Sequence, residues 1–255
     1  GGLDERRLGM STAGWRLLQR LEVHNADLAL AELPERTKAN LGAREVGKFK
    51  VSLDLLYQAE DWMKGAENKE SAAPRMFQLS FSEVPDKEYF MVGKRVVEAT
   101  KEINTILSEL KLTRRRVSMT VEGKLFVSGQ FRIRLGQLIV QSKRTSTVVL
   151  EVQHLSSPSE ESEPFIKELT TFIHGFLSAD TINSVPVAFS NFSLPTTSFT
   201  PKHRALQYVH LVQQAMSSSK KSQAAAASSN SVGGASSAGH TSMPWSSTGS
   251  EEKKR

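Results

Sequence analysis

Three consecutive segments between Val117 and Leu155 set the strongest limit on the fold of this chain. Polar and apolar residues alternate along them with a period of two, which is typical of half-buried strands. Gly123, Gly129 and Gly136 interrupt the alternation, and we interpret them as turns. The pattern predicts an antiparallel β-meander.

The middle segment of this meander indicates how the sheet is covered. Phe131, Ile133 and Leu135 fall on one face of a strand, and Arg132 and Arg134 fall on the other. We therefore expect a sheet with one dry face and one solvated face. Helices from the flanking segments must then cover the dry face.

The flanks supply further strands. Alternation predicts strands at Lys48–Leu55, Phe77–Ser82 and Tyr89–Val92, with a turn at Pro85–Asp86 that makes the last two a hairpin. The leucines between Trp15 and Leu33 are too irregularly spaced to assign a helix or a strand.

Helical periodicity predicts three helices. Apolar residues recur at helical spacing over 100–112 and over 164–177, and Thr200–Pro201 has the residues of a helix start. The segment 59–74 is polar and is interpreted as a loop. The basic run 114–116 is interpreted as solvated residues that lead into the meander.

The C-terminal segment differs in composition from the rest of the chain. Residues 217–255 contain 13 Ser, 6 Ala and 4 Gly, with a single aromatic residue, Trp245. Such a segment buries too little apolar surface to offset the entropy of ordering, so we predict a disordered tail. The predicted folded domain is residues 1–216, with the elements of 1–47 left open. Half of the net charge of +6 lies in the tail, so basicity is weak support for nucleic-acid binding.

No catalytic, metal-binding or cofactor-binding motif is recognisable. The chain has no cysteine, no phosphate-binding glycine loop and no run approaching the roughly 20 apolar residues that span a bilayer. His203 and His210 are seven residues apart, whereas zinc ligands on adjacent helical turns are four apart. We expect no enzyme activity, no cofactor, no metal, no small-molecule substrate and no membrane partner.

The best candidates for a functional surface lie near the end of the domain. Three phenylalanines without regular spacing occupy a predicted extended loop at 178–200, and an apolar stripe follows on the last helix. Burial in the chain's own core and docking on a partner are both open interpretations. The candidate partner-binding residues are Phe189, Phe192, Phe199, Leu206 and Val209.

Several stretches between Phe77 and Met216 resemble the Mediator complex subunit 20 family in its fungal form. They are FQLSFSEVPDKEYFMV, VVEATKEINTILSEL, VEGKLFVSGQFRIRLGQLIV, VVLEVQHL, FIKELTTFIHGFL and RALQYVHLV. The most distinctive step is G-x-F-x-I/V-R-x-G, seen here from Gly129 to Gly136.

This resemblance implies a fold and a set of partners. The fold is α+β, an antiparallel β-barrel of about eight strands with flanking helices, followed here by the disordered tail. The implied partners are Mediator subunit 18 as a heterodimer, a helix of Mediator subunit 8, the remaining Mediator head and RNA polymerase II, in the nucleus. The family opens with an apolar strand, but this chain opens with the polar sequence GGLDERR. We therefore expect its first strand to be absent or replaced, which would leave an unpaired edge.

Two other function classes stay open as alternatives. A tunnel-type phosphohydrolase would direct Lys124, Arg132 and Arg134 at a phosphate. A nucleic-acid-binding module would use Arg114–Arg116 and Lys143–Arg144 against phosphates, although that face lacks stacking aromatics. The primary interpretation is a non-enzymatic subunit that works by docking in a transcriptional coactivator, and direct nucleic-acid binding is not expected.

Overall fold

A computed structural model describes residues 16–22, 25–58, 76–111, 113–155, 171, 182–184, 187–195 and 199–229. The predicted loop at 59–74 lies outside these residues, and so does the predicted helix at 164–177 except for Thr171, which is helical. No helix among the described residues has the length and apolar content needed to cross a lipid bilayer.

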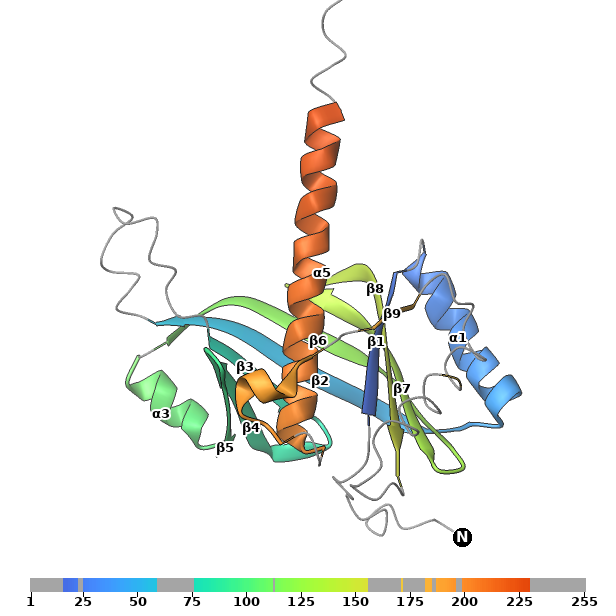
Figure 1. The fold of residues 1–255 in the computed structure, drawn as a ribbon, viewed down its shortest axis with the longest axis horizontal. Coiled ribbons are helices and arrows are strands. Elements are labelled where there is room, and N and C mark those ends of the chain that lie inside the picture. Colours follow the sequence, from blue (N-terminus) through green and yellow to red (C-terminus); the bar gives the residue numbers. More distant parts are fainter. Residues whose placement is uncertain are drawn as a thin grey trace, which may run out of the picture. The chain divides into compact units, whose positions relative to one another are not determined.

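The described strands form one antiparallel sheet in the order β5-β4-β3-β2-β6-β7-β8-β1-β9 (Figure 1). The strands are β1 (Arg16–Glu22), β2 (Arg44–Gln58), β3 (Met76–Phe81), β4 (Val84–Val92), β5 (Arg95–Thr100), β6 (Thr113–Ser128), β7 (Phe131–Val140), β8 (Lys143–His154) and β9 (Ile182–Ser184).

The predicted meander is confirmed as β6, β7 and β8, which pair consecutively in antiparallel register. The predicted strand at Lys48–Leu55 is the middle of the longer β2, and the predicted hairpin is β3 with β4. Its turn is at Ser82–Glu83, so the predicted turn at Pro85–Asp86 was placed too late in the chain. Both of these residues belong to β4, which pairs with β3 across a bulge between Ser80 and Phe81.

Gly123 and Gly136 are not turn residues, although they were interpreted in that way. They face each other across β6 and β7, whereas Gly129 alone of the three lies in a turn, with φ +54°. A Cβ added to Gly123 would lie 2.0 Å from the Leu135 carbonyl oxygen. The Phe49 ring takes up the space beside Gly136, where an added Cβ would lie 2.8 Å from Cζ. These two glycines permit close packing of the strands against an aromatic ring.

In the described part of the chain, three α-helices with defined bounds accompany the sheet: α1 (Ala26–Leu41), α3 (Ile103–Glu109) and α5 (Pro201–Ser229). Asn25 caps α1 by accepting a hydrogen bond from the Leu28 amide at 3.1 Å, and Gly42 ends the helix at φ +57°. The start of α5 at Pro201 confirms the predicted helix start. The predicted helix at 100–112 is present as the shorter α3, because β5 takes up Thr100.

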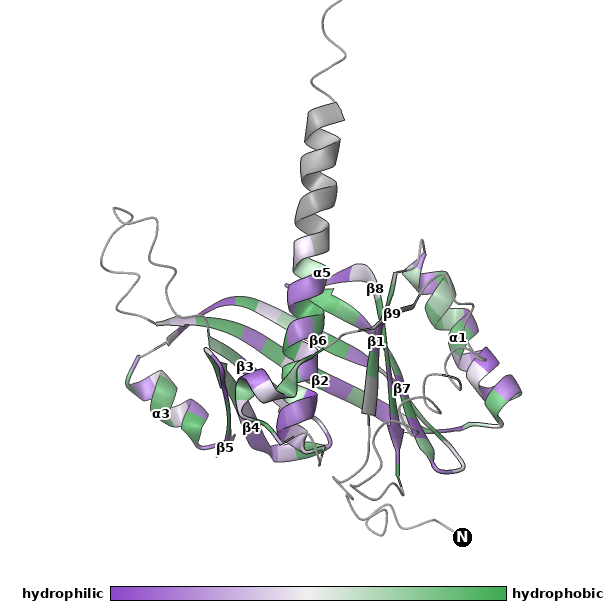
Figure 2. Ribbon diagram, in the orientation of Figure 1, coloured by the Kyte–Doolittle hydropathy of each residue, from purple (hydrophilic) through white to green (hydrophobic). Residues whose placement is uncertain are grey.

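Both faces of the sheet are covered over β7, so the expected solvated face is wrong for this strand. Ile133 and Leu135 pack in a cluster with Leu33 of α1 on one face. On the opposite face, Arg134 is only 1% exposed. Figure 2 shows the alternating hydrophilic and hydrophobic bands along β2, β6 and β7 that produce the two faces. The second cover comes from α5, whose residues Leu206, Val209 and Val212 are fully buried.

The antiparallel sheet with flanking helices is confirmed, but the barrel is not closed within the described residues. Nine strands are present, and the edge strands β5 and β9 are not paired with each other. The interior of a closed eight-stranded barrel has room for side chains only, whereas an α-helix with its side chains is about 10–12 Å wide. A sheet that curves around α5 therefore has to stay open (Figure 1).

The expectation that the first strand is absent is wrong. Strand β1 follows the polar start of the chain, and it pairs with β8 from Arg16 to Glu22 and with β9 at its other side. Leu18 and Leu21 are 1% exposed and point to opposite faces, which is why their spacing did not show the period of two.

The chain divides into two compact units, Gly1–Ala215 and Met216–Arg255. Within the predicted tail, helix α5 continues to Ser229, and residues 230–255 lie outside the described part. The first unit carries the sheet and all the surfaces considered below.

Candidate docking site

The first turns of α5 are buried almost all round, which is unusual for a helix at the end of a domain. The seven consecutive residues from His203 to Val209 are each 6% exposed or less, and seven consecutive residues extend around every side of a helix. A helix that is apolar on several sides needs contacts on several sides, and the curved sheet supplies them. Helix α5 is therefore an internal part of the fold.

A cluster of charged side chains fixes α5 to the sheet. Arg134 of β7 donates to Glu151 at 3.0 Å and, through Nε, to Glu83 of the β3–β4 turn at 2.9 Å. Arg204 of α5 donates to Glu151 from Nε at 3.1 Å and from Nη2 at 3.0 Å, and it also donates to Glu83. Tyr208 donates to the same Glu151 oxygen at 2.7 Å. Two arginines thus bridge the same two carboxylates.

The protonation states in this buried charge cluster follow from its geometry. Burial by itself would raise the pKa of Glu83, but the charges of Arg204 and Arg134 hold it below the ordinary value. Burial would likewise lower the pKa of Arg204, but Glu151 and Glu83 raise it. Burial and the neighbouring Glu151 raise the pKa of Tyr208 well above its ordinary value. Glu83 is therefore charged at neutral pH, and Tyr208 keeps its proton.

Both carboxylates of this cluster are held in hydrogen-bonded pairs with arginine. Every oxygen of Glu83 and Glu151 already accepts a hydrogen bond from a guanidinium group. A metal ion would have to displace an arginine from each carboxylate. No group of three or more potential metal ligands occurs in the described part of the chain.

The residues of the phosphohydrolase alternative do not converge. Lys124 pairs with Leu135, and Leu125 pairs with Arg134, so Lys124 lies on the opposite face of the sheet from Arg132 and Arg134. Strand periodicity could have shown this separation of Lys124 only if the pairing of the two strands had been known. The three cations cannot bind one phosphate together.

Three of the five cations of the nucleic-acid alternative have acceptors within the chain. Arg115 lies 3.6 Å from Asp54, Arg116 donates to the Tyr57 hydroxyl at 2.9 Å, and Arg144 lies 3.6 Å from Asp27. Arg114–Arg116 belong to β6, as expected from their interpretation as residues leading into the meander.

The five candidate partner-binding residues fall into two groups. Phe199, Leu206 and Val209 are buried within this chain, at 6%, 0% and 0% exposure. Phe189 and Phe192 delimit a short 3-10 helix, η3 (Phe189–Phe192), and both are only partly buried. A partner can reach this second pair without any movement of α5.

Histidines of α5 support these two phenylalanines. The Phe189 ring lies 4.8 Å from the His203 ring, and the Phe192 ring lies 5.6 Å from the His210 ring, in edge contacts. His203 uses both ring nitrogens: Nδ1 lies 2.8 Å from the Thr200 hydroxyl, and Nε2 lies 2.7 Å from the Pro195 carbonyl oxygen. The ring contacts of both histidines and the bonds of His203 thus hold η3 against α5.

A second apolar surface lies at β5 and α3. Four of the five exposed large hydrophobic residues in the described part of the chain belong to β4, β5, α3 and the C-cap of α3. They are Val92, Val97, Ile106 and Leu110, at 43%, 49%, 48% and 59% exposure. Asn104 attaches α3 to the sheet by hydrogen bonds with Gln78 at 2.8 Å and Glu88 at 3.1 Å. The helical periodicity of α3 was recognised correctly, but its apolar side is largely exposed.

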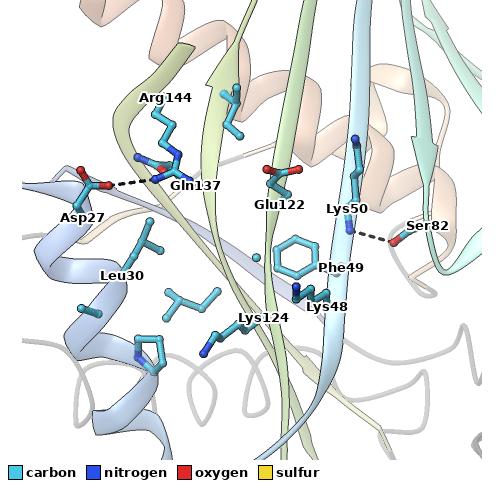
Figure 3. Close-up of a pocket in the computed structure, with 15 residues that line it drawn as sticks. Asp27, Leu30, Lys48, Phe49, Lys50, Ser82, Glu122, Lys124, Gln137 and Arg144 are labelled. Atoms are coloured by element: carbon cyan, nitrogen blue, oxygen red, sulfur yellow. Dashed lines mark hydrogen bonds and ion pairs between the residues drawn. The ribbon is translucent and has the colours of Figure 1, made fainter. Parts of the chain in front are cut away.

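A groove of about 890 Å³ runs beside α1, across β7, β6 and β2 (Figure 3). Leu30, Ala31 and Pro34 of α1 form one wall, and Leu135 and Ile139 of β7 contribute apolar floor. The charged residues that line the groove are Asp27, Lys48, Lys50, Glu122, Lys124 and Arg144.

Comparison with known proteins gives one family. The family model described as the TATA-binding related factor of subunit 20 of the Mediator complex matches residues 18–215. The chain is 30% identical over 198 residues to Mediator of RNA polymerase II transcription subunit 20b of Arabidopsis thaliana, covering 74% of this chain and 87% of that protein.

Similar solved structures are more distant. A chain of the Schizosaccharomyces pombe Mediator head module is 12% identical, with 66% of this chain and 96% of that chain covered and a TM-score of 0.37. An RNA triphosphatase from the same yeast is 7% identical, with 64% and 82% covered and a TM-score of 0.31. Neither likeness carries a functional argument.

Proposed function

The chain belongs to the Mediator subunit 20 family, and from this premise we propose that it is a non-enzymatic docking subunit of the Mediator head. The observation that carries the proposal is the family match over residues 18–215, nearly the whole of the first unit. The protein would work in the nucleus and relay regulatory contacts to RNA polymerase II. Its proposed partners are Mediator subunit 18, as a heterodimer, and a helix of Mediator subunit 8.

The state of the buried carboxylates supports a docking function over catalysis. Glu83 and Glu151 are neutralised by Arg134 and Arg204, so the interior of the sheet holds a completed structural cluster. A phosphohydrolase of the tunnel type needs free carboxylates for a cation in that place.

We assign the contact with subunit 18 to the partly buried pair Phe189 and Phe192. Partly exposed aromatic rings are typical of residues that dominate a protein interface. Phe199, Leu206 and Val209 would contribute indirectly, because they hold α5 and thereby the rings of His203 and His210.

Co-expression with tagged subunit 18 tests this proposal. We expect the two chains to co-purify, and we expect Phe189→Ser combined with Phe192→Ser to weaken the heterodimer at least about tenfold. The matched control is Val97→Ser combined with Ile106→Ser, which removes two exposed apolar side chains of β5 and α3.

The two double variants have distinguishable outcomes. Loss of co-purification in the phenylalanine variant alone supports the assignment. Loss in the control variant alone transfers the interface to the β5–α3 surface and contradicts the assignment of residues. Failure of the unaltered chains to co-purify, with both chains folded by circular dichroism, contradicts the heterodimer itself.

A further inference from the structure

The groove beside α1 has a composition that the proposed heterodimer does not explain. Its cationic side chains, Lys48, Lys50 and Lys124, lie on the same face of the sheet as Leu135 and α1. Within the described part of the chain, no ion pair joins the Lys48 or Lys50 ammonium group to a carboxylate, although Glu122 lies opposite Lys50 in the register of β2 and β6. Figure 3 shows both side chains at the side of the groove away from α1, across β6.

The register of β2 and β6 places like charges together. Lys48 lies directly opposite Lys124 in this antiparallel pair. Like charges at such positions destabilise a sheet. Among the described residues Lys124 forms an ion pair with Glu45 at 3.3 Å, and Lys38 also approaches this carboxylate, at 3.6 Å. Acidic groups from outside the chain would offset this repulsion.

The dimensions of the groove indicate the shape of its occupant. Strands in a sheet are about 4.8 Å apart, so β2 lies roughly 10 Å from β7 across β6. Helices packed side by side on a sheet face are separated by a similar 8–10 Å. Because α1 packs against residues of β7 and β8, a second helix beside it would lie over β6 and β2.

We propose that this groove binds an acidic amphipathic α-helix of a partner protein. Its apolar side would contact Leu30, Pro34 and Ile139, and its Asp or Glu side chains would pair with Lys48 and Lys50. A nucleic acid fits less well, because its phosphate backbone has no apolar side to cover Leu30, Pro34 and Ile139. The proposal does not depend on which Mediator subunit forms the heterodimer.

Fluorescence anisotropy with the full chain provides the test. The probe is a labelled designed helix of about 16 residues, with leucines on one side and glutamates on the other. A peptide with lysine in place of every glutamate, and a DNA duplex of about 16 base pairs, serve as comparison probes. We expect saturable binding of the acidic helix alone, weakened by added salt.

Charge variants locate the binding site. Lys48→Glu combined with Lys50→Glu should weaken binding of the acidic helix at least about tenfold. Lys94→Glu combined with Arg95→Glu makes the same change in net charge at exposed positions outside the groove, and it should leave the affinity within about twofold. If both double variants lost the same amount of affinity, the effect would come from net charge alone, and the proposal would be overturned.

A matched pair of variants on α1 tests the apolar wall of the groove. Leu30→Ser should weaken binding several-fold, whereas Leu28→Ser changes an exposed residue that does not line the groove and should have no effect. Melting curves establish that each variant is folded. Binding of the DNA duplex as tight as that of the acidic helix, or no binding of the acidic helix, would overturn the proposal.

Discussion

Replacing Glu151 with Gln should destabilise the protein strongly, because this carboxylate is the acceptor for three side chains. Its Oε1 accepts from Arg134, and its Oε2 accepts from Arg204 and Tyr208. An amide has only one acceptor oxygen, so either orientation turns an NH₂ group toward a guanidinium group. Both arginines would stay buried with only Glu83 to balance them.

The magnitude follows from the burial of the pair. Glu151 and Arg134 have side chains that are each 1% exposed, and removing one partner of such a pair typically costs about 3–5 kcal/mol. The exposed pair of Lys87 and Glu98 is the control. These side chains are 41% and 32% exposed, so Glu98→Gln should cost no more than about 1 kcal/mol.

The assay is urea denaturation of the purified chain followed by far-ultraviolet circular dichroism. The double variant Glu151→Gln with Arg204→Met should be less destabilised than the sum of the two single variants, by roughly 1–3 kcal/mol, since it removes an ion pair as a unit. A cost for Glu151→Gln below about 1 kcal/mol, equal to the control, would refute the reasoning and indicate that water solvates the cluster.

Three further predictions concern the strands, the helix and the tail. Gly123→Ala should prevent stable folding, because the new Cβ would overlap the Leu135 carbonyl oxygen, whereas Gly47→Ala, with no atom within 4 Å, should change the free energy of unfolding by less than about 1 kcal/mol in the same denaturation assay. Burial lowers the pKa of His203 below 6.5, although its bond to the Pro195 carbonyl opposes this shift, so the folded state binds fewer protons than the unfolded state. Its contribution to stability is complete above about pH 6.5 and should decrease as the pH falls toward the folded-state pKa; denaturation at a series of pH values should show a smaller slope in His203→Gln. Deleting residues 217–255 should leave the melting temperature within about 2 °C and subunit 18 bound, and a lost heterodimer in the pull-down would contradict this.

The parts of the fold with local patterns were predictable from the sequence. The meander was recognised because Phe131, Ile133 and Leu135 alternate with their neighbours, and consecutive antiparallel strands need only tight turns. Strand β1 was missed because Leu18 and Leu21 both become buried on opposite faces, which removes the period of two. Strand β5 was missed because Val96 and Val97 alone suggested no alternation before the helix.

The site was less accessible, since it depends on contacts between distant segments. Arg134 was assigned to a solvated face because its acceptors lie 51 and 17 residues away, at Glu83 and Glu151. The burial of Arg134 is explained only once α5 is in place, because α5 carries Arg204, which binds the same two carboxylates. The groove beside α1 has the same origin, because Lys48 and Lys124 become neighbours through the register of β2 and β6.

The position of α5 in the chain has a consequence for biosynthesis. Arg204 joins Glu83 across 121 residues, and the helix that carries it is the last element of the first unit to leave the ribosome. Until residues 201–215 emerge, the nascent sheet exposes the apolar residues that α5 later covers. Such incomplete chains are prone to aggregation, and folding of the unit can finish only after its synthesis is nearly complete. A stop codon shortly before Pro201 should therefore give a chain that depends on chaperones, although every described strand of the sheet has already been made.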